Sequence, residues 1–269
     1  MPEIVLNRSH YLARRLCAWW MADRATAPRF RELVNNTPLT PGGSQANYTG
    51  HSARYWTRFG AFDFATNSTY APWTSTVFLP RGAHSFIFTG SFRGTSGSVW
   101  SAFRDSADMG LYVAGAPTKW YVHTSGLWLI DSATSLYTGA VGPEVGFHIA
   151  VTIDGTGASS SRKGYTNGAV FGSDSTNGWT GSAGTRTVYL AGDAYSQPWA
   201  GGIESIRYFD GALSAEDVAL DYREWQLGWR FLLSSPLDLS LAALGDADGA
   251  APTDVPRGGR NYLLQELMR

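Results

Sequence analysis

Short runs in which apolar and polar residues alternate cover most of the chain, and a period of two predicts β-strands. In residues 146–154 every second residue from Phe147 to Ile153 is apolar. We expect this run to be a central strand with its apolar set facing a core between two sheets. Asn167 and Gly168 form a hairpin signal, since both adopt positive φ at low cost. Further strands are predicted at residues 59–64, 85–92, 99–104, 109–114 and 119–124.

A helix is predicted near the end of this strand-rich region. The strand at residues 203–210 ends in Asp210 and Gly211, which signal a turn. Ser214 and Asp217 match a capping box, in which the two side chains satisfy otherwise unpaired N–H groups of the first helical turn. The apolar face of the helix consists of Val218, Tyr222 and Trp225, which recur at helical spacing.

The composition changes after Pro236. Residues 237–258 are rich in Ala, Asp, Gly and Pro and show no strand pattern, which is typical of a linker or arm. The final ten residues are apolar and helix-prone, and an exposed apolar end is costly unless something covers it. We therefore expect a β domain at residues 1–236 and a C-terminal arm at residues 237–269, whose end docks on its own domain or on a partner. The candidate docking residues are Tyr262, Leu263, Leu264, Leu267 and Met268.

Composition and charge narrow the function. Only 16% of the residues are charged, whereas the chain has 31 Gly and 14% aromatic residues, a balance typical of short strands joined by tight turns. A net charge of −1 gives no basic field for nucleic acid. No window approaches the ~20 apolar residues of a membrane-spanning helix, and no apolar run after Arg14 and Arg15 suggests a signal peptide. Cys17 is the single cysteine, so it forms no intramolecular disulfide, and we expect it to be buried.

Residues 202–218 carry the most specific pattern. The closing strand and short helix of laminin-G-like, concanavalin-type jelly-roll domains resemble Gly202–Phe209, Ala212–Ser214 and Asp217–Val218, with Glu204 at the usual Asp position. Residues 146–155 and 163–170 resemble two further elements of that family. The resemblance implies an all-β, concanavalin A-like/laminin-G-like jelly-roll sandwich of two antiparallel sheets, with a short helix near the end and a C-terminal arm.

The opening of the chain, residues 6–21, resembles the start of lectin-like domains encoded by phages and by some environmental bacteria. Tyr11 replaces the usual Pro and Arg15 replaces the usual Gly, so the lead-in bend is expected to differ.

The sequence offers few groups for catalysis. Laminarinase-like glucanases of this superfamily carry paired carboxylates in an E-x-D-x-x-E pattern, and alternate residues of one strand would place these about 5 Å apart. This chain has no such pattern, and its five histidines are far apart in sequence. We therefore expect no catalytic residues and no cofactor. Calcium is common in laminin-G-like domains, so the resemblance leaves calcium open, with Asp63, Asp154 and Asp193 as the residues at predicted strand ends; each could instead cap a turn.

The 11 tryptophans are the remaining resource. Trp19, Trp20, Trp225 and Trp229 lie in apolar elements, and we expect them in the core. Aromatic faces stack on sugar rings and anchor interfaces. For any single tryptophan near a turn, a place in the core or as a loop plug is favoured over a role in binding. The candidate carbohydrate-binding residues are Trp100, Trp120, Trp128, Trp179 and Trp199.

The lead-in and the ending at residues 219–227 resemble phage-encoded domains. This implies a non-enzymatic virion structural protein of a tailed phage, which decorates the capsid or tail after assembly in the host cytoplasm. Its expected partners are other virion proteins, further copies of itself and a cell-surface glycan, with neither nucleic acid nor membrane insertion involved. The alternatives are a bacterial carbohydrate-binding or adhesion module and, with less support, a glycoside hydrolase.

Overall fold

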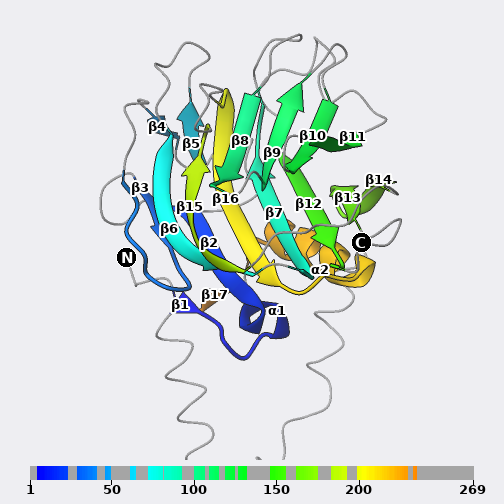
Figure 1. Cartoon of the computed structure of the whole chain (residues 1–269). Helices are drawn as coiled ribbons and strands as arrows, with labels where there is room; N and C mark the ends of the chain where they lie inside the picture. The colour runs from blue at the N-terminus through cyan, green and yellow to red at the C-terminus, as the bar shows by residue number, and fades with distance from the viewer. Residues whose placement is uncertain are drawn as a thin grey trace, which may run out of the picture.

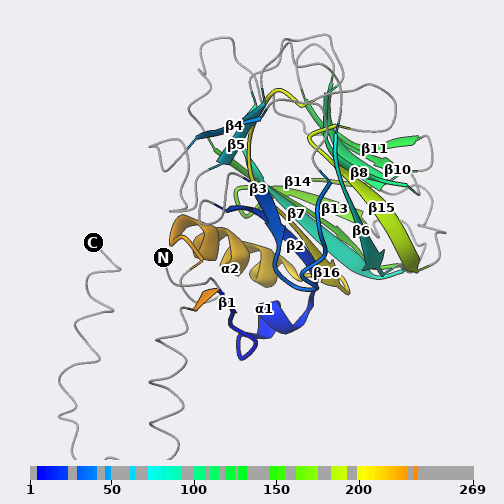
Figure 2. The ribbon, with the colours of Figure 1, turned by 90° about the vertical axis from the view of Figure 1, so that its left-hand side faces the viewer.

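Two antiparallel sheets stack face to face, and a helix covers the outer side of one of them (Figures 1 and 2). The computed structural model describes residues 5–23, 29–40, 46–49, 61–64, 72–80, 82–92, 100–106, 109–114, 119–124, 127–131, 146–155, 162–174, 183–192, 199–229 and 233–234. The predicted all-β sandwich with a short helix near its end is confirmed.

Within these described ranges, one sheet has nine strands and the other has six. The nine-stranded sheet contains β2 (Leu16–Asp23), β3 (Arg29–Glu32), β4 (Ala46–Thr49), β5 (Ala61–Phe64), β7 (His84–Gly90), β12 (Phe147–Ile153), β13 (Arg162–Thr166), β14 (Ala169–Asp174) and β16 (Gly201–Asp210). The six-stranded sheet runs in the order β11 (Leu127–Asp131), β10 (Lys119–Thr124), β9 (Met109–Ala114), β8 (Trp100–Asp105), β15 (Gly184–Leu190) and β6 (Trp73–Leu79). The predicted meander is β8 to β10, and β11 extends it.

Every second side chain of the central strands packs in the core between the sheets, as predicted for residues 146–154. Ile149, Val151 and Ile153 of β12 pack in this core, and β12 pairs with β7 on one side and β13 on the other. The six-stranded sheet contributes apolar side chains such as Val188 and Leu111 from the opposite wall. The predicted hairpin is also confirmed, because Asn167 (φ 50°) and Gly168 (φ 79°) join β13 to β14.

A second apolar cluster lies on the other face of the nine-stranded sheet, under helix α2 (Ala215–Gln226). The intervening residues of the same strands build it, for example Trp19 of β2 and Ala150 of β12, which pack with Val218 and Trp225 of α2. The predicted helix therefore covers the outer face of the nine-stranded sheet (Figure 2). The four tryptophans predicted for the core are all fully buried: Trp19, Trp20, Trp225 and Trp229.

The two ends of the described chain meet beside α2. β1 (Val5–Leu6) pairs with β17 (Leu233–Ser234), and a short helix, α1 (Tyr11–Arg14), precedes β2 (Figure 1). Cys17 at the start of β2 is half-buried rather than fully buried, and burial raises the pKa of its thiol to about 12.

Candidate functional site

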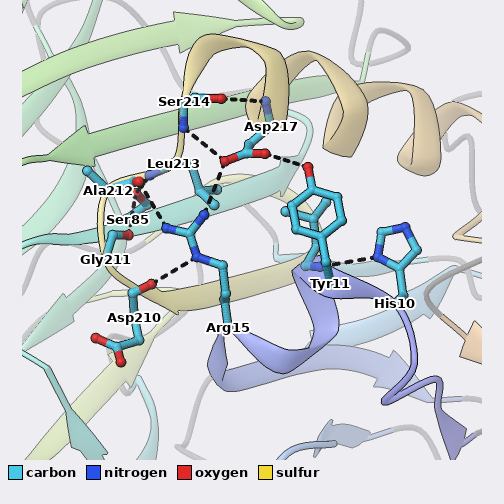
Figure 3. Close-up of polar contacts among 11 residues, drawn as sticks. His10, Tyr11, Arg15, Ser85, Asp210, Gly211, Ala212, Leu213, Ser214 and Asp217 are labelled. Carbon is cyan, nitrogen blue, oxygen red and sulfur yellow. Dashed lines mark hydrogen bonds and ion pairs between the residues drawn. The ribbon is translucent and has the colours of Figure 1, made fainter.

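The predicted capping box begins helix α2 (Figure 3). The Ser214 hydroxyl accepts a hydrogen bond from the Asp217 N–H at 3.1 Å, and the Asp217 carboxylate accepts one from the Ser214 N–H at 3.1 Å. Just before the helix, the Leu213 N–H donates to the Ser85 hydroxyl of β7 at 2.8 Å. The first turn of α2 is thus tied directly to the nine-stranded sheet.

The Asp217 carboxylate also receives the lead-in of the chain. Arg15 forms an ion pair with it at 3.1 Å, and the Tyr11 hydroxyl donates a hydrogen bond to it (Figure 3). Arg15 further donates to the carbonyls of Asp210 and Ala212 at 3.2 and 2.9 Å. Burial, aided by the bond to Asp217, raises the pKa of Tyr11 to about 12. Tyr11 and Arg15 are the two departures from the lectin-like lead-in, and both bind the start of α2.

Beneath α2 lies a buried ionic cluster of three side chains. Asp221 of α2 accepts hydrogen bonds from Arg207 Nη1 at 2.6 Å and from His148 Nε2 at 2.9 Å. All three side chains are 0% exposed. The Arg207 guanidinium also lies 5.5 and 5.1 Å from the ring centroids of Trp19 and Trp229, so two aromatic faces contact the cation.

The buried cluster has a defined charge state. Burial alone raises the pKa of Asp221, but Arg207 and His148 together hold it below its usual range. Burial lowers the pKa of His148, and this effect outweighs the hydrogen bond to Asp221. Asp221 is therefore ionised and paired with Arg207, while a neutral His148 donates its Nε2 proton. Although a His–Asp pair can serve in catalysis, a pair with no solvent exposure stabilises the helix–sheet contact instead.

Other buried carboxylates have structural partners as well. Glu204 of β16 accepts a hydrogen bond from Trp225 Nε1 at 2.7 Å, which joins the sheet to α2 again. Glu32 at the end of β3 accepts from backbone N–H groups, at 3.0 Å from Trp19 and 2.6 Å from Asn35 among others. Both carboxylates are almost completely buried. Both carboxylates accept hydrogen bonds that stabilise the fold, and neither faces solvent.

The structure does not show the three candidate calcium ligands, Asp63, Asp154 and Asp193, next to one another. Asp154 is exposed at the end of β12, Asp63 lies in β5, and Asp193 is outside the described residues. Among the residues described, no group of three or more His, Cys, Asp or Glu is placed to hold a metal ion. Calcium binding stays a prediction.

The tryptophan candidates fall in different places. Trp199 is 0% exposed and packs against Phe88 and Phe92 in the core between the sheets, with ring centroids 5.3 and 5.2 Å away. The prediction that it binds carbohydrate is therefore wrong, because a ligand has no access to it. Trp179 lies outside the described residues.

Strand register separates the other three tryptophans. Trp100 of β8 and Trp120 of β10 are both in register with Val113 of β9, a residue of the core between the sheets. Paired residues share one face of a sheet, so these two positions are on the core-facing rows. Trp128 of β11 is in register with His123, which pairs with Gly110. Its position belongs to the opposite, outer row.

The outer face of the six-stranded sheet is open along β6 and β15. Trp73, Val77 and Leu79 of β6 face the core, whereas Thr76 and Phe78 are exposed. Phe78 is 60% exposed. On β15, Val188 and Leu190 face the core. Register places three pairs on the outer face: Phe78 with Thr185, Thr76 with Thr187, and Thr74 with Tyr189.

The predicted docking residues Tyr262, Leu263, Leu264, Leu267 and Met268 lie outside the described residues. Neither of the helices in the described part of the chain is long and apolar enough to cross a membrane.

The sequence matches no known family model and no curated protein. The fold, however, is similar to solved structures. One is domain 4 of AbnA, an extracellular GH43 arabinanase of Geobacillus stearothermophilus, in complex with arabinotriose: it is 18% identical, with a TM-score of 0.55 over 77% of this chain and 98% of that one.

Two further similar structures are from botulinum neurotoxins. The binding domain of serotype D/C is 10% identical, with a TM-score of 0.58 over 79% of this chain and 53% of that chain. Neurotoxin type C, whose cell entry is dependent upon interaction with two ganglioside molecules, is 12% identical, with a TM-score of 0.58 over 80% and 52%. This chain spans about half the length of both toxin structures. At these identities the likeness establishes a sandwich of β-sheets, compatible with a lectin-like jelly roll.

Sequence reasoning missed the contacts of Tyr11 and Arg15 with Asp217, the buried cluster around Asp221, and the open face of β6 and β15. Asp221 follows Val218 by three residues and precedes Trp225 by four, so it lies on the apolar side of the helix. A carboxylate there signals a buried partner, although the partner cannot be read from the sequence. Strand β6 was also missed, yet its alternation between Pro72 and Pro80 and its β-branched residues could have revealed it.

Proposed function

We propose that this domain is a non-catalytic glycan-binding module. The observation that carries the proposal is the open outer face of β6 and β15, where aromatic rings and hydroxyl groups stand at every second register pair. Small-molecule sites combine apolar or aromatic surface with a few placed polar groups. The similar fold of an arabinanase domain in complex with arabinotriose, and of a toxin that interacts with gangliosides, supports the proposal.

Binding to immobilised glycans tests this function. The purified protein is applied to an array of plant and microbial oligosaccharides and ganglioside glycans, and each signal is confirmed by calorimetry. We expect saturable binding to at least one glycan. An array without saturable signal at millimolar glycan would contradict the proposal.

The non-catalytic part has its own test. Protein incubated with arabinan, laminarin, agar or carrageenan should release no reducing sugar. Turnover that disappears in Glu204→Gln, with the fold intact, would overturn this part, since the structure gives buried Glu204 a structural role as the acceptor for Trp225.

We further propose that the module decorates the capsid or tail of a tailed phage. Support comes from the resemblance of the lead-in, residues 6–21, and of the ending at residues 219–227 to phage-encoded lectin-like domains. Capsid and tail genes beside the coding gene, and the protein in purified particles by mass spectrometry, are the expected findings. Neighbouring genes for bacterial surface or polysaccharide-degrading proteins would favour the bacterial adhesion module instead.

In this proposal residues 237–269 attach the domain to a virion protein or to a further copy. Their removal should leave the melting temperature nearly unchanged and abolish oligomerisation or particle incorporation. A truncated protein that unfolds would place this segment in the domain's own core, and one that still assembles would place attachment on the sandwich.

A further inference from the structure

The outer surface of β6 and β15 has an ordered chemical pattern. Its six positions form three cross-strand pairs: Phe78 with Thr185, Thr76 with Thr187, and Thr74 with Tyr189. One aromatic ring therefore stands at each end, on opposite strands, and threonines occupy every position between them. All seven register pairs of these strands are continuous from Gly184–Leu79 to Leu190–Trp73, without a bulge. We call these six residues the Phe78–Tyr189 surface.

This surface is accessible at one end and half-covered at the other. Phe78, Thr76 and Thr185 are exposed, while Thr74, Thr187 and Tyr189 are half-buried. The Phe78 ring is far more exposed than most aromatic side chains of the described residues, whose larger members are buried in the two cores. Because the same strand places Val77 and Leu79 in the core, the outward direction of Phe78 is fixed by the strand and not by a loop.

The surface carries no charge. None of its six residues is ionised at neutral pH, and the charged register neighbour of Tyr189 on β8, Arg104, is buried and already has an interaction of its own. Aromatic rings stack on the apolar faces of sugar rings, and hydroxyl groups donate and accept hydrogen bonds. This combination matches a neutral sugar chain better than a sulfated or carboxylated one, which would require a paired cation.

The spacing sets the size of the ligand. Position 74, the register partner of Tyr189, lies four residues from Phe78 on the same strand, which corresponds to about 13 Å. A single sugar ring does not reach both aromatic side chains. A chain of several sugars laid along β6 and β15 contacts both rings and the threonines between them.

We infer that the Phe78–Tyr189 surface is the binding site for a neutral oligosaccharide extended along β6 and β15. The inference rests on the proposed glycan-binding function and adds the site, the charge class and the minimum length of the ligand.

The test compares single variants by calorimetry, using the neutral oligosaccharide that gives the strongest array signal. Phe78→Ala and Tyr189→Ala should each lower affinity about tenfold or more, because stacked aromatic residues dominate such contacts. Val170→Ala is the matched control: Val170 is also an apolar side chain 60% exposed, but it lies on β14 of the other sheet. This control should bind like the parent protein.

Two series of measurements test the predicted length and the predicted neutral charge of the ligand. The trisaccharide should bind more tightly than its monosaccharide, and affinity should be nearly unchanged between 50 and 500 mM NaCl, since no exposed charge pair contributes. Preferential binding of sialylated or sulfated glycans with strong salt dependence would overturn the neutral class. Equal affinity for monosaccharide and trisaccharide would overturn the extended site.

The outcomes separate this inference from the proposed function. If the parent protein binds a glycan and both aromatic variants bind equally well, the inference is wrong and the function stands. If binding is lost only in Trp128→Ala, the binding site lies at β11, at the other edge of the six-stranded sheet. If the parent protein binds no glycan, both the function and the inference are overturned.

Discussion

The two outer faces of the sandwich differ in where their polar groups are placed. On the nine-stranded sheet, Arg207 and His148 are fully buried beneath α2 and both bind Asp221 of that helix, which is also fully buried. On the six-stranded sheet, the Phe78–Tyr189 surface exposes hydroxyls and aromatic rings without any charge. The first face joins a helix to the domain, and the second is left available to a ligand.

The difference has an energetic origin. An ionised group without solvent must be paired, since an unpaired buried charge costs several kcal/mol. Asp221 meets this condition by binding both Arg207 and His148, and the Trp19 and Trp229 rings flank the cation. Exposed threonines need no partner because water satisfies them. We therefore expect substitutions on the covered face to change stability, and substitutions on the open face to change binding.

The largest effect is predicted for Asp221→Ala. This variant leaves Arg207 buried without its carboxylate and should lower the free energy of unfolding by about 3–5 kcal/mol. Urea denaturation followed by tryptophan fluorescence measures it. Arg223→Ala, on the exposed side of the same helix, should stay within about 0.5 kcal/mol of the parent protein. Equal stability of the two variants would refute the distinction between the faces.

Acidification should weaken the covered face through His148. The folded-state pKa of His148 lies below its ordinary value of 6.5, so the unfolded chain binds the proton first. Its contribution is fully present above pH 6.5 and is lost as the pH falls below that value, by up to about 2 kcal/mol at pH 5. Asp221 also has a lowered pKa, but its contribution is lost only below about its ordinary value of 3.8.

The comparison of pH 7.5 with pH 5.0 isolates this effect. His148→Gln keeps an N–H donor and has no titrating ring, so its stability should fall less between the two pH values than that of the parent protein. A parallel fall in both proteins would show that other groups cause the acid sensitivity.

A smaller loss is expected from the helix cap. Ser214→Ala removes the acceptor for the Asp217 N–H and should cost about 1 kcal/mol. Asp217 also binds Tyr11 and Arg15 and remains in this variant, so the measured loss shows how much these two residues stabilise the start of the helix without the cap. Thermal melts that coincide with the parent protein would mean that those contacts hold the helix without the cap.

The smallest effect on stability is predicted for the open face. Phe78→Ala removes a largely exposed side chain and should change the free energy of unfolding by less than about 0.5 kcal/mol. A loss of several kcal/mol would show that Phe78 supports the fold, and reduced glycan affinity in this variant could then not be assigned to a lost contact.

Local patterns predicted the parts of the fold that depend on neighbouring residues. The alternation of residues 147–153 predicted β12, and Ser214 with Asp217 predicted the start of α2. The second buried face of β12 was not predicted, because Ala150 and His148 alternate with the apolar residues and match the solvent-facing side of a strand. In the structure α2 covers both residues. The sequence of a strand gives little indication that a helix far away in the chain will bury its second face.

The candidate site was predicted less well, for a similar reason. Trp199 was a candidate for carbohydrate binding, but the glycines that follow it allow close strand contact: a Cβ on Gly201 would lie 2.1 Å from the Ser91 carbonyl oxygen. That approach closes the core around Trp199. A phenylalanine in a strand would normally be assigned to a core, but Phe78 is 60% exposed because its neighbours Val77 and Leu79 face the core.

The most direct test of the central claim is a map of backbone amide shifts during titration with a neutral trisaccharide. The account predicts saturable shifts in residues 74–78 and 185–189, with α2 and residue 170 unchanged. Shifts concentrated on α2, or on β10 and β11 with residues 74–78 unaffected, would contradict the claim that the open face of β6 and β15 binds the ligand.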